Sequence, residues 1–158
     1  MNNEVLIWVK SIKDKFNIKG NILDLGSLDV NGTTKPIFND SIYTGIDMRA
    51  GKNVDIIGYS YDIKFNNNTF DCVVSTEMLE HDIRPWLSIL EIHRVLKPGG
   101  ITILTARSIG FPKHGYPNDY WRFTADGIKE LLIYGNFNAI FAKETKDLGV
   151  YAYGFKKI

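Results

Sequence analysis

One stretch decides the fold, and it reads Asn21-Ile22-Leu23-Asp24-Leu25-Gly26-Ser27-Leu28-Asp29-Val30-Asn31-Gly32. Its apolar run, residues 22–25, has the length of a strand and carries one carboxylate, Asp24. A turn rich in Gly, Asp and Asn follows, and residues 33–36 then predict the first turn of a helix. This order places backbone N–H groups and an acid at the carboxyl edge of a sheet, where open α/β folds bind ligands.

The turn after this strand has two interpretations. It could merely connect a strand to a helix, with Gly26 and Gly32 chosen because they tolerate positive φ. It could instead be part of a ligand site, because an acid at the end of a buried strand is costly unless something binds it. We favour the ligand site.

Composition limits the remaining possibilities. The 158 residues, 44% hydrophobic and 23% charged, are typical of a globular protein, and we expect one domain spanning residues 1–158. The net charge of +1 gives no electrostatic case for a nucleic-acid or membrane partner. Cys72 is the single cysteine, and the apolar stretch Val5–Val9 is too short for a signal peptide. We therefore expect a reduced, cytoplasmic setting.

The hydrophobic pattern alternates between helix and strand. An amphipathic helix is expected over residues 4–16, a short helix near 36–39, and longer helices over 85–96 and 125–134. The segment 97–100, Lys-Pro-Gly-Gly, is expected to stop the third of these. Strands are expected over 21–25, 42–46, 54–57, 70–75, 101–106, 137–143 and 150–156. The alternation predicts a doubly wound α/β fold whose sheet is mainly parallel, with an antiparallel C-terminal strand.

A second acid, Asp47, ends the second predicted strand, 23 positions after Asp24. A carboxylate there can accept both hydroxyls of a ribose, although alone it is better explained as a strand-end acid satisfied by water. The two acids together favour a nucleoside-containing ligand. The Gly-x-Gly-x-x-Gly pattern of dinucleotide sites is absent, and Asp24 and Asp29 would repel a diphosphate. They suit a ligand with an ammonium group and a positive centre, such as a nucleoside that carries an amino acid on a sulfonium.

Four stretches, taken in order, resemble a known family: residues 22–27, 43–47, 70–81 and 91–100. The sequence is similar to class I S-adenosylmethionine (SAM)-dependent methyltransferases of the methyltransferase-domain type. The resemblance implies SAM as cofactor, S-adenosylhomocysteine (SAH) as product, and a three-layer, Rossmann-like, seven-stranded sheet.

The resemblance also implies roles for single residues. Asp24 and Gly26 fall near the methionine amino group of the cofactor, Asp47 at the ribose hydroxyls, and Glu77 at the methionine end. His81 falls beside the cofactor, although a purely structural role is open. The whole set of expected cofactor-binding residues is Asp24, Gly26, Ser27, Asp47, Met48, Tyr59, Asp62, Thr76, Glu77 and His81.

Two departures from the family pattern alter the expected site. The glycine-rich turn is interrupted, so a longer turn with its tight corner at residues 31–32 is expected. The acid that usually binds the adenine amino group is missing from its place near Tyr59. Either Asp62 or backbone groups of residues 60–61 take over, with Tyr59 or Ile63 against the ring.

A long loop, residues 108–123, follows the fifth predicted strand and starts at the same sheet edge, so it can cover the acceptor side of the site. Three of its polar side chains are candidate catalytic groups: His114, Asp119 and Tyr120. Histidine has the resting pKa that suits a general base. Aromatic residues such as Trp121 are expected to anchor the loop to the core.

The expected reaction is in-line displacement, in which an oxygen or nitrogen of a small-molecule acceptor attacks the sulfonium methyl group. No spacing of His, Cys or acidic residues indicates a metal site. A non-catalytic protein that binds SAM or another nucleoside is the alternative, and a nicotinamide-dependent oxidoreductase is disfavoured by the missing glycine pattern. A homodimer is possible through an edge strand or the N-terminal helix.

Overall fold

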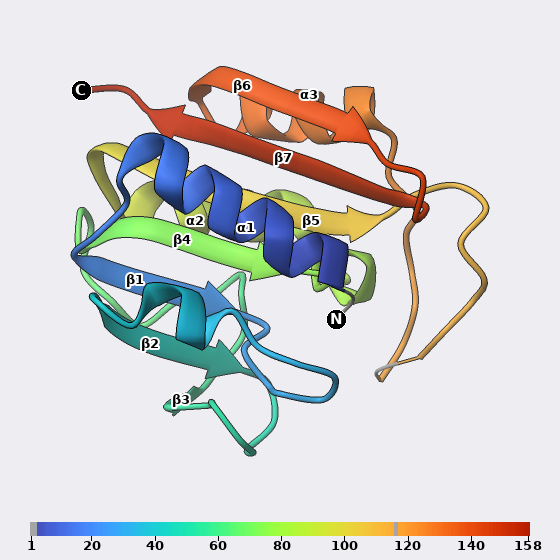
Figure 1. The fold of residues 1–158 in the computed structure, drawn as a ribbon, viewed down its shortest axis with the longest axis horizontal. Coiled ribbons are helices and arrows are strands. Elements are labelled where there is room, and N and C mark those ends of the chain that lie inside the picture. The colour runs from blue at the N-terminus through green and yellow to red at the C-terminus, as the bar shows by residue number, and fades with distance from the viewer. Residues whose placement is uncertain (1–2, 116) are drawn as a thin grey trace.

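The computed structural model describes residues 3–115 and 117–158 and contains one seven-stranded sheet, with strand order β3-β2-β1-β4-β5-β7-β6 (Figure 1). Strands β1 to β5 pair with one another in parallel, whereas β7 runs antiparallel to both β5 and β6. The predicted fold class is therefore confirmed. The strands are β1 (Asn21–Leu25), β2 (Ile42–Asp47), β3 (Ile56–Ile57), β4 (Phe70–Thr76), β5 (Leu96–Arg107), β6 (Phe137–Glu144) and β7 (Gly149–Lys156).

Helices cover both faces of the sheet. Helix α1 crosses the front face in Figure 1, and α2 and α3 lie behind the sheet. Two separate apolar cores result, one under α1 and one under α2 and α3. The helices are α1 (Asn3–Phe16), α2 (Pro85–Val95) and α3 (Ala125–Tyr134), with short 3₁₀ turns η1 (Lys35–Phe38) and η2 (Leu79–His81). None of the helices in the described ranges is long and apolar enough to span a lipid bilayer.

The helix ends follow local rules. Helix α1 buries Val5, Val9 and Ile12 on one face, as its hydrophobic spacing predicts. At the start of α3, the Thr124 side chain accepts a hydrogen bond of 3.0 Å from the backbone N–H of Gly127, so it caps an otherwise unpaired donor. Pro85 stands in the first turn of α2, where its missing N–H costs nothing.

The largest difference from the predicted elements lies at residues 97–100. They were predicted as a stop between a helix and a strand, but β5 already begins at Leu96. The pairing of β4 and β5 is irregular here, because Phe70 pairs with Leu96 whereas Cys72 pairs with Ile101. The extra residues of β5 form a bulge in the β4–β5 pairing. This bulge accommodates Pro98 and the positive φ of Gly99 within a paired strand.

Two other elements differ from the prediction, one in length and one in helix type. Strand β3 contains only Ile56–Ile57, and the helix predicted near residues 36–39 is the 3₁₀ turn η1. Asn53 has a positive φ of 67° just before β3, and the Asp55 N–H bonds to the Gly45 carbonyl outside the regular ladder. The segment before Ile56 is therefore a turn, and strand pairing starts only after it.

Close packing around β2 leads to a stability prediction. A Cβ atom at Gly45 would lie 2.1 Å from the carbonyl oxygen of Asn53 and 2.6 Å from the Ser27 hydroxyl. The variant Gly45→Ala is expected to lower the free energy of unfolding by about 1–3 kcal/mol, because backbone would have to move. Urea unfolding measures this change.

The matched control is Gly58→Ala, at a position where an added Cβ would meet only a methyl group of Ile46, at 3.6 Å. Its free energy of unfolding is expected to stay within about 0.5 kcal/mol of the parent. Equal losses in the two variants would contradict the packing argument.

Candidate functional site

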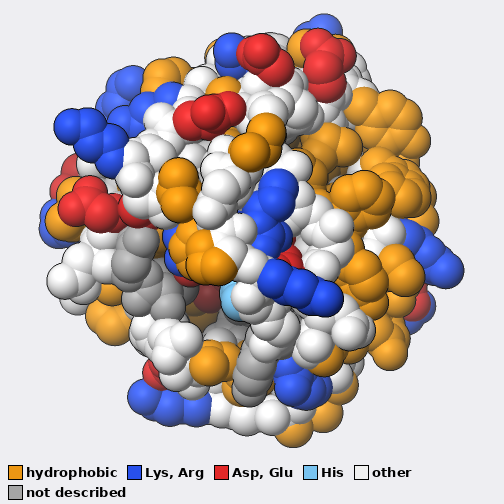
Figure 2. Space-filling view, turned by 90° about the vertical axis from the view of Figure 1, so that its right-hand side faces the viewer, with side chains coloured by type: hydrophobic (Ala, Val, Ile, Leu, Met, Phe, Trp, Pro, Cys, Tyr) orange, Lys and Arg blue, Asp and Glu red, His pale blue; other side chains and the backbone are white. Residues whose placement is uncertain are grey.

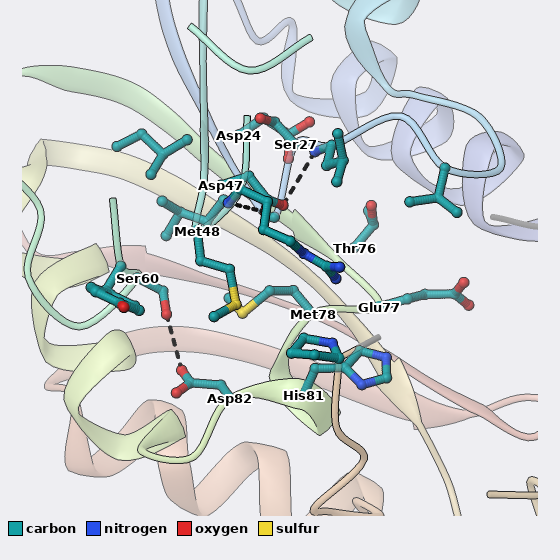
Figure 3. A pocket seen from close by; sticks show the side chains of 18 of the residues that line it. Asp24, Ser27, Asp47, Met48, Ser60, Thr76, Glu77, Met78, His81 and Asp82 are labelled. Carbon is teal, nitrogen blue, oxygen red and sulfur yellow. Dashed lines mark hydrogen bonds between the residues drawn. The ribbon is translucent and has the colours of Figure 1, made fainter. Parts of the chain in front are cut away.

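A cavity of about 460 Å³ opens at the carboxyl edge of the sheet, where β1, β2 and β4 end. Figure 2 looks onto this edge and shows a hollow with a histidine side chain inside it. In Figure 3, Asp24, Ser27 and Asp47 lie on one side of the cavity and His81 and Asp82 on the opposite side. Residues that are distant in sequence therefore meet around one space.

Asp24 is the most deeply buried acid on the β1 side, with 3% of its surface exposed. Its Oδ2 atom accepts hydrogen bonds from the Tyr43 hydroxyl and, at 3.2 Å, from the Thr34 hydroxyl. Its Oδ1 atom has no hydrogen-bond partner among the described residues. Burial raises the pKa of Asp24 to about 6, although the bonds from Tyr43 and Thr34 favour the charged form. A buried acceptor with one open oxygen is suited to bind a cationic donor.

This burial gives the stability of the protein a pH dependence. The folded protein holds the Asp24 proton more tightly than the unfolded chain, whose pKa is near 3.8, so ionisation destabilises the fold as pH rises from about 4 to about 6. The variant Asp24→Asn keeps the acceptor without the charge. Its stability relative to the parent is expected to rise by about 3 kcal/mol between pH 4 and pH 7, measured by urea unfolding.

The control for this variant is Asp126→Asn, which changes an exposed acid on α3. Its difference from the parent is expected to change little over the same pH range, because its ion pair with Lys129 is exposed. If the difference in unfolding free energy between Asp24→Asn and the parent did not change with pH, burial would not raise the pKa of Asp24 in the folded protein.

Asp47 ends β2 next to Asp24, and local backbone holds its carboxylate. The N–H of Arg49 donates to Oδ1 at 3.0 Å and the N–H of Leu28 donates to Oδ2 at 3.3 Å. Each oxygen keeps a further lone pair for a ligand hydroxyl. Figure 3 shows these two bonds orienting the side chain toward the cavity.

The turn after β1 is longer than a glycine-rich turn, as expected. Gly26 has a φ of +80°, and a Cβ atom there would lie 2.7 Å from the Met78 side chain. The Asp29 carboxylate accepts the N–H of Gly32 at 2.9 Å and pairs with Lys52 at 2.7 Å. Asp29 therefore shapes the corner and is absent from the cavity lining, whereas residues 31–32 line the cavity.

The predicted contact of Asp62 with adenine needs correction. Asp62 does not line the cavity and instead pairs with Lys64 at 2.6 Å on the surface. Asp82 lines the cavity in its place and accepts a hydrogen bond of 3.2 Å from the Ser60 hydroxyl. Tyr59, which does line the cavity, is half-exposed. Asp82 directly follows the matching stretch 70–81, so extending that stretch by one residue would have found it.

The end of β4 forms the floor of the cavity, through Thr76, Glu77 and Met78. Glu77 has a positive φ of 54°, which is unusual for a residue with a side chain, and its N–H donates to the Thr105 carbonyl at 2.9 Å. Its carboxylate forms an ion pair with Arg107. The strained turn exposes backbone to the cavity and fixes where β4 ends.

Comparison with known families and structures agrees with this architecture. A family described as "Methyltransferase domain" matches residues 39–104. The resemblance to class I methyltransferases is confirmed. No curated protein matches the sequence.

Solved methyltransferase structures share the fold at low identity. A Burkholderia thailandensis 1,6-didemethyltoxoflavin-N1-methyltransferase is 14% identical, with a TM-score of 0.78 over 99% of this chain and 80% of that chain. A possible histamine N-methyltransferase from Thermotoga maritima is 14% identical, with a TM-score of 0.72 over 96% and 89%. A Haemonchus contortus enzyme, phosphoethanolamine N-methyltransferase 2, is 15% identical, with a TM-score of 0.76 over 99% and 53%. At these identities the likeness concerns the fold.

On this methyltransferase fold, the loop between β5 and α3 supplies one wall of the cavity. His114 and Tyr120 line the cavity, and Asp119 does not. The Asp119 carboxylate instead accepts two hydrogen bonds from Arg122, at 2.5 and 2.6 Å, and one from the N–H of His114, at 2.7 Å. These bonds hold the pKa of Asp119 well below its usual range. The predicted catalytic contact of Asp119 is therefore replaced by a role in anchoring the loop.

The Arg122 anchor should control how often the loop opens. Arg122 also donates to the carbonyl oxygens of Phe111 and Pro112, so one guanidinium holds both ends of the loop. In Arg122→Gln these bonds are lost, and cleavage by trypsin after the exposed Lys113 is expected to become about tenfold faster, equivalent to about 1.4 kcal/mol. Timed proteolysis with mass spectrometry measures the rate.

The control is Lys64→Gln, which removes an exposed ion pair outside the loop. Its cleavage rate after Lys113 is expected to match that of the parent, because exposed pairs contribute little. An unchanged rate in Arg122→Gln would show that other contacts hold the loop.

One buried acid near the cavity was missed in the sequence, namely Glu80 in η2. It is completely buried, and burial raises the pKa of Glu80 to about 7. His81 follows it in the chain, and His114 reaches it from the loop. His81 and His114 were both candidates for other roles, but the contact of His114 with Glu80 joins segments that the sequence separates.

Proposed function

We propose that this chain is a SAM-dependent methyltransferase that acts as one domain over residues 1–158 and transfers a methyl group to an oxygen or nitrogen of a small molecule. One observation carries the proposal: Asp24 and Asp47 end adjacent parallel strands and line the same cavity. The methyltransferase-domain match and the shared fold support the same reaction class.

The residues present fit SAM as cofactor. The open Oδ1 atom of Asp24 would accept a hydrogen bond from the ammonium group of the methionine moiety, which would also offset the cost of its buried charge. The remaining lone pairs of Asp47 would accept the ribose hydroxyls. Ser27, Met48, Tyr59, Thr76, Glu77 and His81 line the cavity and complete the proposed binding set.

Bound SAM supplies a methyl group activated by its positive sulfur. The protein then has to align an acceptor with that methyl group and keep water out, which can lower the barrier by several kcal/mol. His114 and Tyr120 line the cavity from the loop and would face the acceptor. The Nδ1 atom of His114 lies 3.3 Å from the buried Asp119 carboxylate, without a hydrogen bond between them.

A small acceptor is favoured over a macromolecule. The cavity of about 460 Å³ has the size of small-molecule sites and is walled by the anchored loop. The net charge of +1 gives no electrostatic case for a nucleic-acid acceptor. The cytoplasmic setting and the homodimer stay predictions.

Calorimetry with SAH tests the cofactor site. The parent is expected to bind SAH with a dissociation constant below 1 mM, in the range of about 10⁻⁶–10⁻⁴ M. Asp47→Ala is expected to weaken binding at least about tenfold, because two ribose hydroxyls lose their acceptor. Asp126→Ala, on the exposed face of α3, is the control and should bind like the parent.

Two results would contradict the proposal. One is the absence of SAH binding by the parent at millimolar concentration. The other is equal binding by the parent and Asp47→Ala, which would mean that the ligand lies elsewhere.

The second candidate is a non-catalytic protein that binds SAM or another nucleoside. The altered turn after β1 favours it. Separately, a [4+2]-cyclase, SpnF, has the same fold with a TM-score of 0.71 at 15% identity. The fold therefore also occurs in a protein named for a different reaction. Bound SAM without turnover across a broad panel of hydroxyl and amine acceptors would favour this candidate.

A further inference from the structure

The buried carboxylate of Glu80 is compensated inside the fold only by the charge of Arg107 and by nearby backbone N–H groups, which lie outside hydrogen-bond geometry. None of its surface is exposed, and neither carboxylate oxygen has a hydrogen-bond partner among the described residues. The nearby guanidinium groups are engaged elsewhere, Arg107 with Glu77 and Arg122 with Asp119. A buried carboxylate in this state costs several kcal/mol unless a cation or a proton joins it.

Two histidine rings converge on this carboxylate. The Nε2 atom of His81 lies 4.0 Å from Glu80 Oε1, and the Nε2 atom of His114 lies 3.9 Å from the same oxygen. The two rings are 4.7 Å apart in an edge-to-face arrangement, and one ligand atom from each of the three residues lies within 4.8 Å of the others. Three potential metal ligands thus surround one point.

The other nitrogen of each ring lies beside an oxygen acceptor. His81 Nδ1 lies 2.5 Å from the carbonyl oxygen of Asn118, and His114 Nδ1 lies 3.3 Å from Oδ2 of Asp119. An Nδ1–H of His81 that donates to Asn118 leaves the lone pair of its Nε2 directed to the Glu80 side. His114 Nδ1 makes no hydrogen bond to Asp119 as placed, so a small rotation of its ring would be needed for the same arrangement. Metal-binding histidines in proteins are typically oriented by such outer acceptors.

We propose that Glu80, His81 and His114 form a binding site for a divalent transition-metal ion of the Zn²⁺ class. Two imidazoles and one carboxylate are typical ligands of Zn²⁺ and related ions, whereas Mg²⁺ and Ca²⁺ prefer oxygen alone. Ligand distances of about 2.0–2.2 Å require the three donors to approach one another slightly more closely. Side-chain rotation of His114, on the loop, can supply this movement.

The position of the site indicates what the ion would do. It would join η2 to the loop between β5 and α3, and so fix the loop over the cavity. His81 and His114 both line the cavity, as the labelled His81 shows in Figure 3. With three protein ligands, a fourth coordination position remains for water or for an oxygen of the acceptor. The site does not depend on SAM binding.

The chain offers a matched control, because it has three histidines and only two of them belong to the proposed site. The other, His93 on α2, packs against Phe137 of β6. The single cysteine, Cys72, is buried and provides no competing exposed thiol. Metal-free protein, prepared with a chelator, is titrated with Co²⁺ by visible absorption and with Zn²⁺ by calorimetry. One ion per chain is expected, with a Co²⁺ spectrum typical of nitrogen and oxygen ligands, and no comparable binding of Mg²⁺.

The variants His81→Gln and His114→Gln are expected to weaken Zn²⁺ binding at least about 100-fold, and Asp119→Asn about tenfold, as outer partners typically do. His93→Gln is expected to bind like the parent. Thermal unfolding in the presence of chelator verifies that each variant is folded, and His114→Gln, on the loop, tests the site even if His81→Gln does not fold. Parent-like binding by His114→Gln, an equal loss in His93→Gln, or no binding by the parent would overturn the proposal.

Discussion

The parallel register of β1 with β2 and β4 is the constraint on which the rest of the structure depends. Asp24 pairs with Gly45 on one side and with Val74 on the other, so all three strands end at the same edge. A shift of one residue would turn the Asp24 side chain to the opposite face of the sheet. The two apolar cores hold this register, and the cavity follows from it.

Unfavourable features are concentrated at this one edge. Asp24 and Glu80 are buried acids with unpartnered oxygens, and Glu77 has a left-handed backbone between them in the chain. Single unfavourable features also occur elsewhere, such as the positive φ of Ala139 in β6 and the Nε1 atom of Trp8, which has no hydrogen-bond partner in the described part of the chain. Such a concentration of costs is typical of functional sites, where a ligand supplies the missing interactions.

Local sequence signals predicted the sheet, most helices and the two acids that end β1 and β2, because each depends on a few neighbouring residues. Asp62 was expected at the cavity but pairs with Lys64 outside it, since whether a loop side chain points inward depends on packing; residues 60–61, the other expected choice, line the cavity. The cluster of Glu80 with His114 could not be predicted from spacing alone. It joins a turn after β4 to a loop after β5, and only the folded loop brings them together.

The loop between β5 and α3, which projects at the right of Figure 1, is held at its base and against η2. Ser108 and Phe123 pair at its base, and Arg122 ties the base to both the start of the loop and Asp119. The described backbone hydrogen bonds between the loop and the sheet lie at this base and not at the tip. Relatives could therefore diverge in the tip alone, acquiring new acceptors while inheriting an unaltered scaffold, and an engineer could graft a foreign tip at the same boundaries.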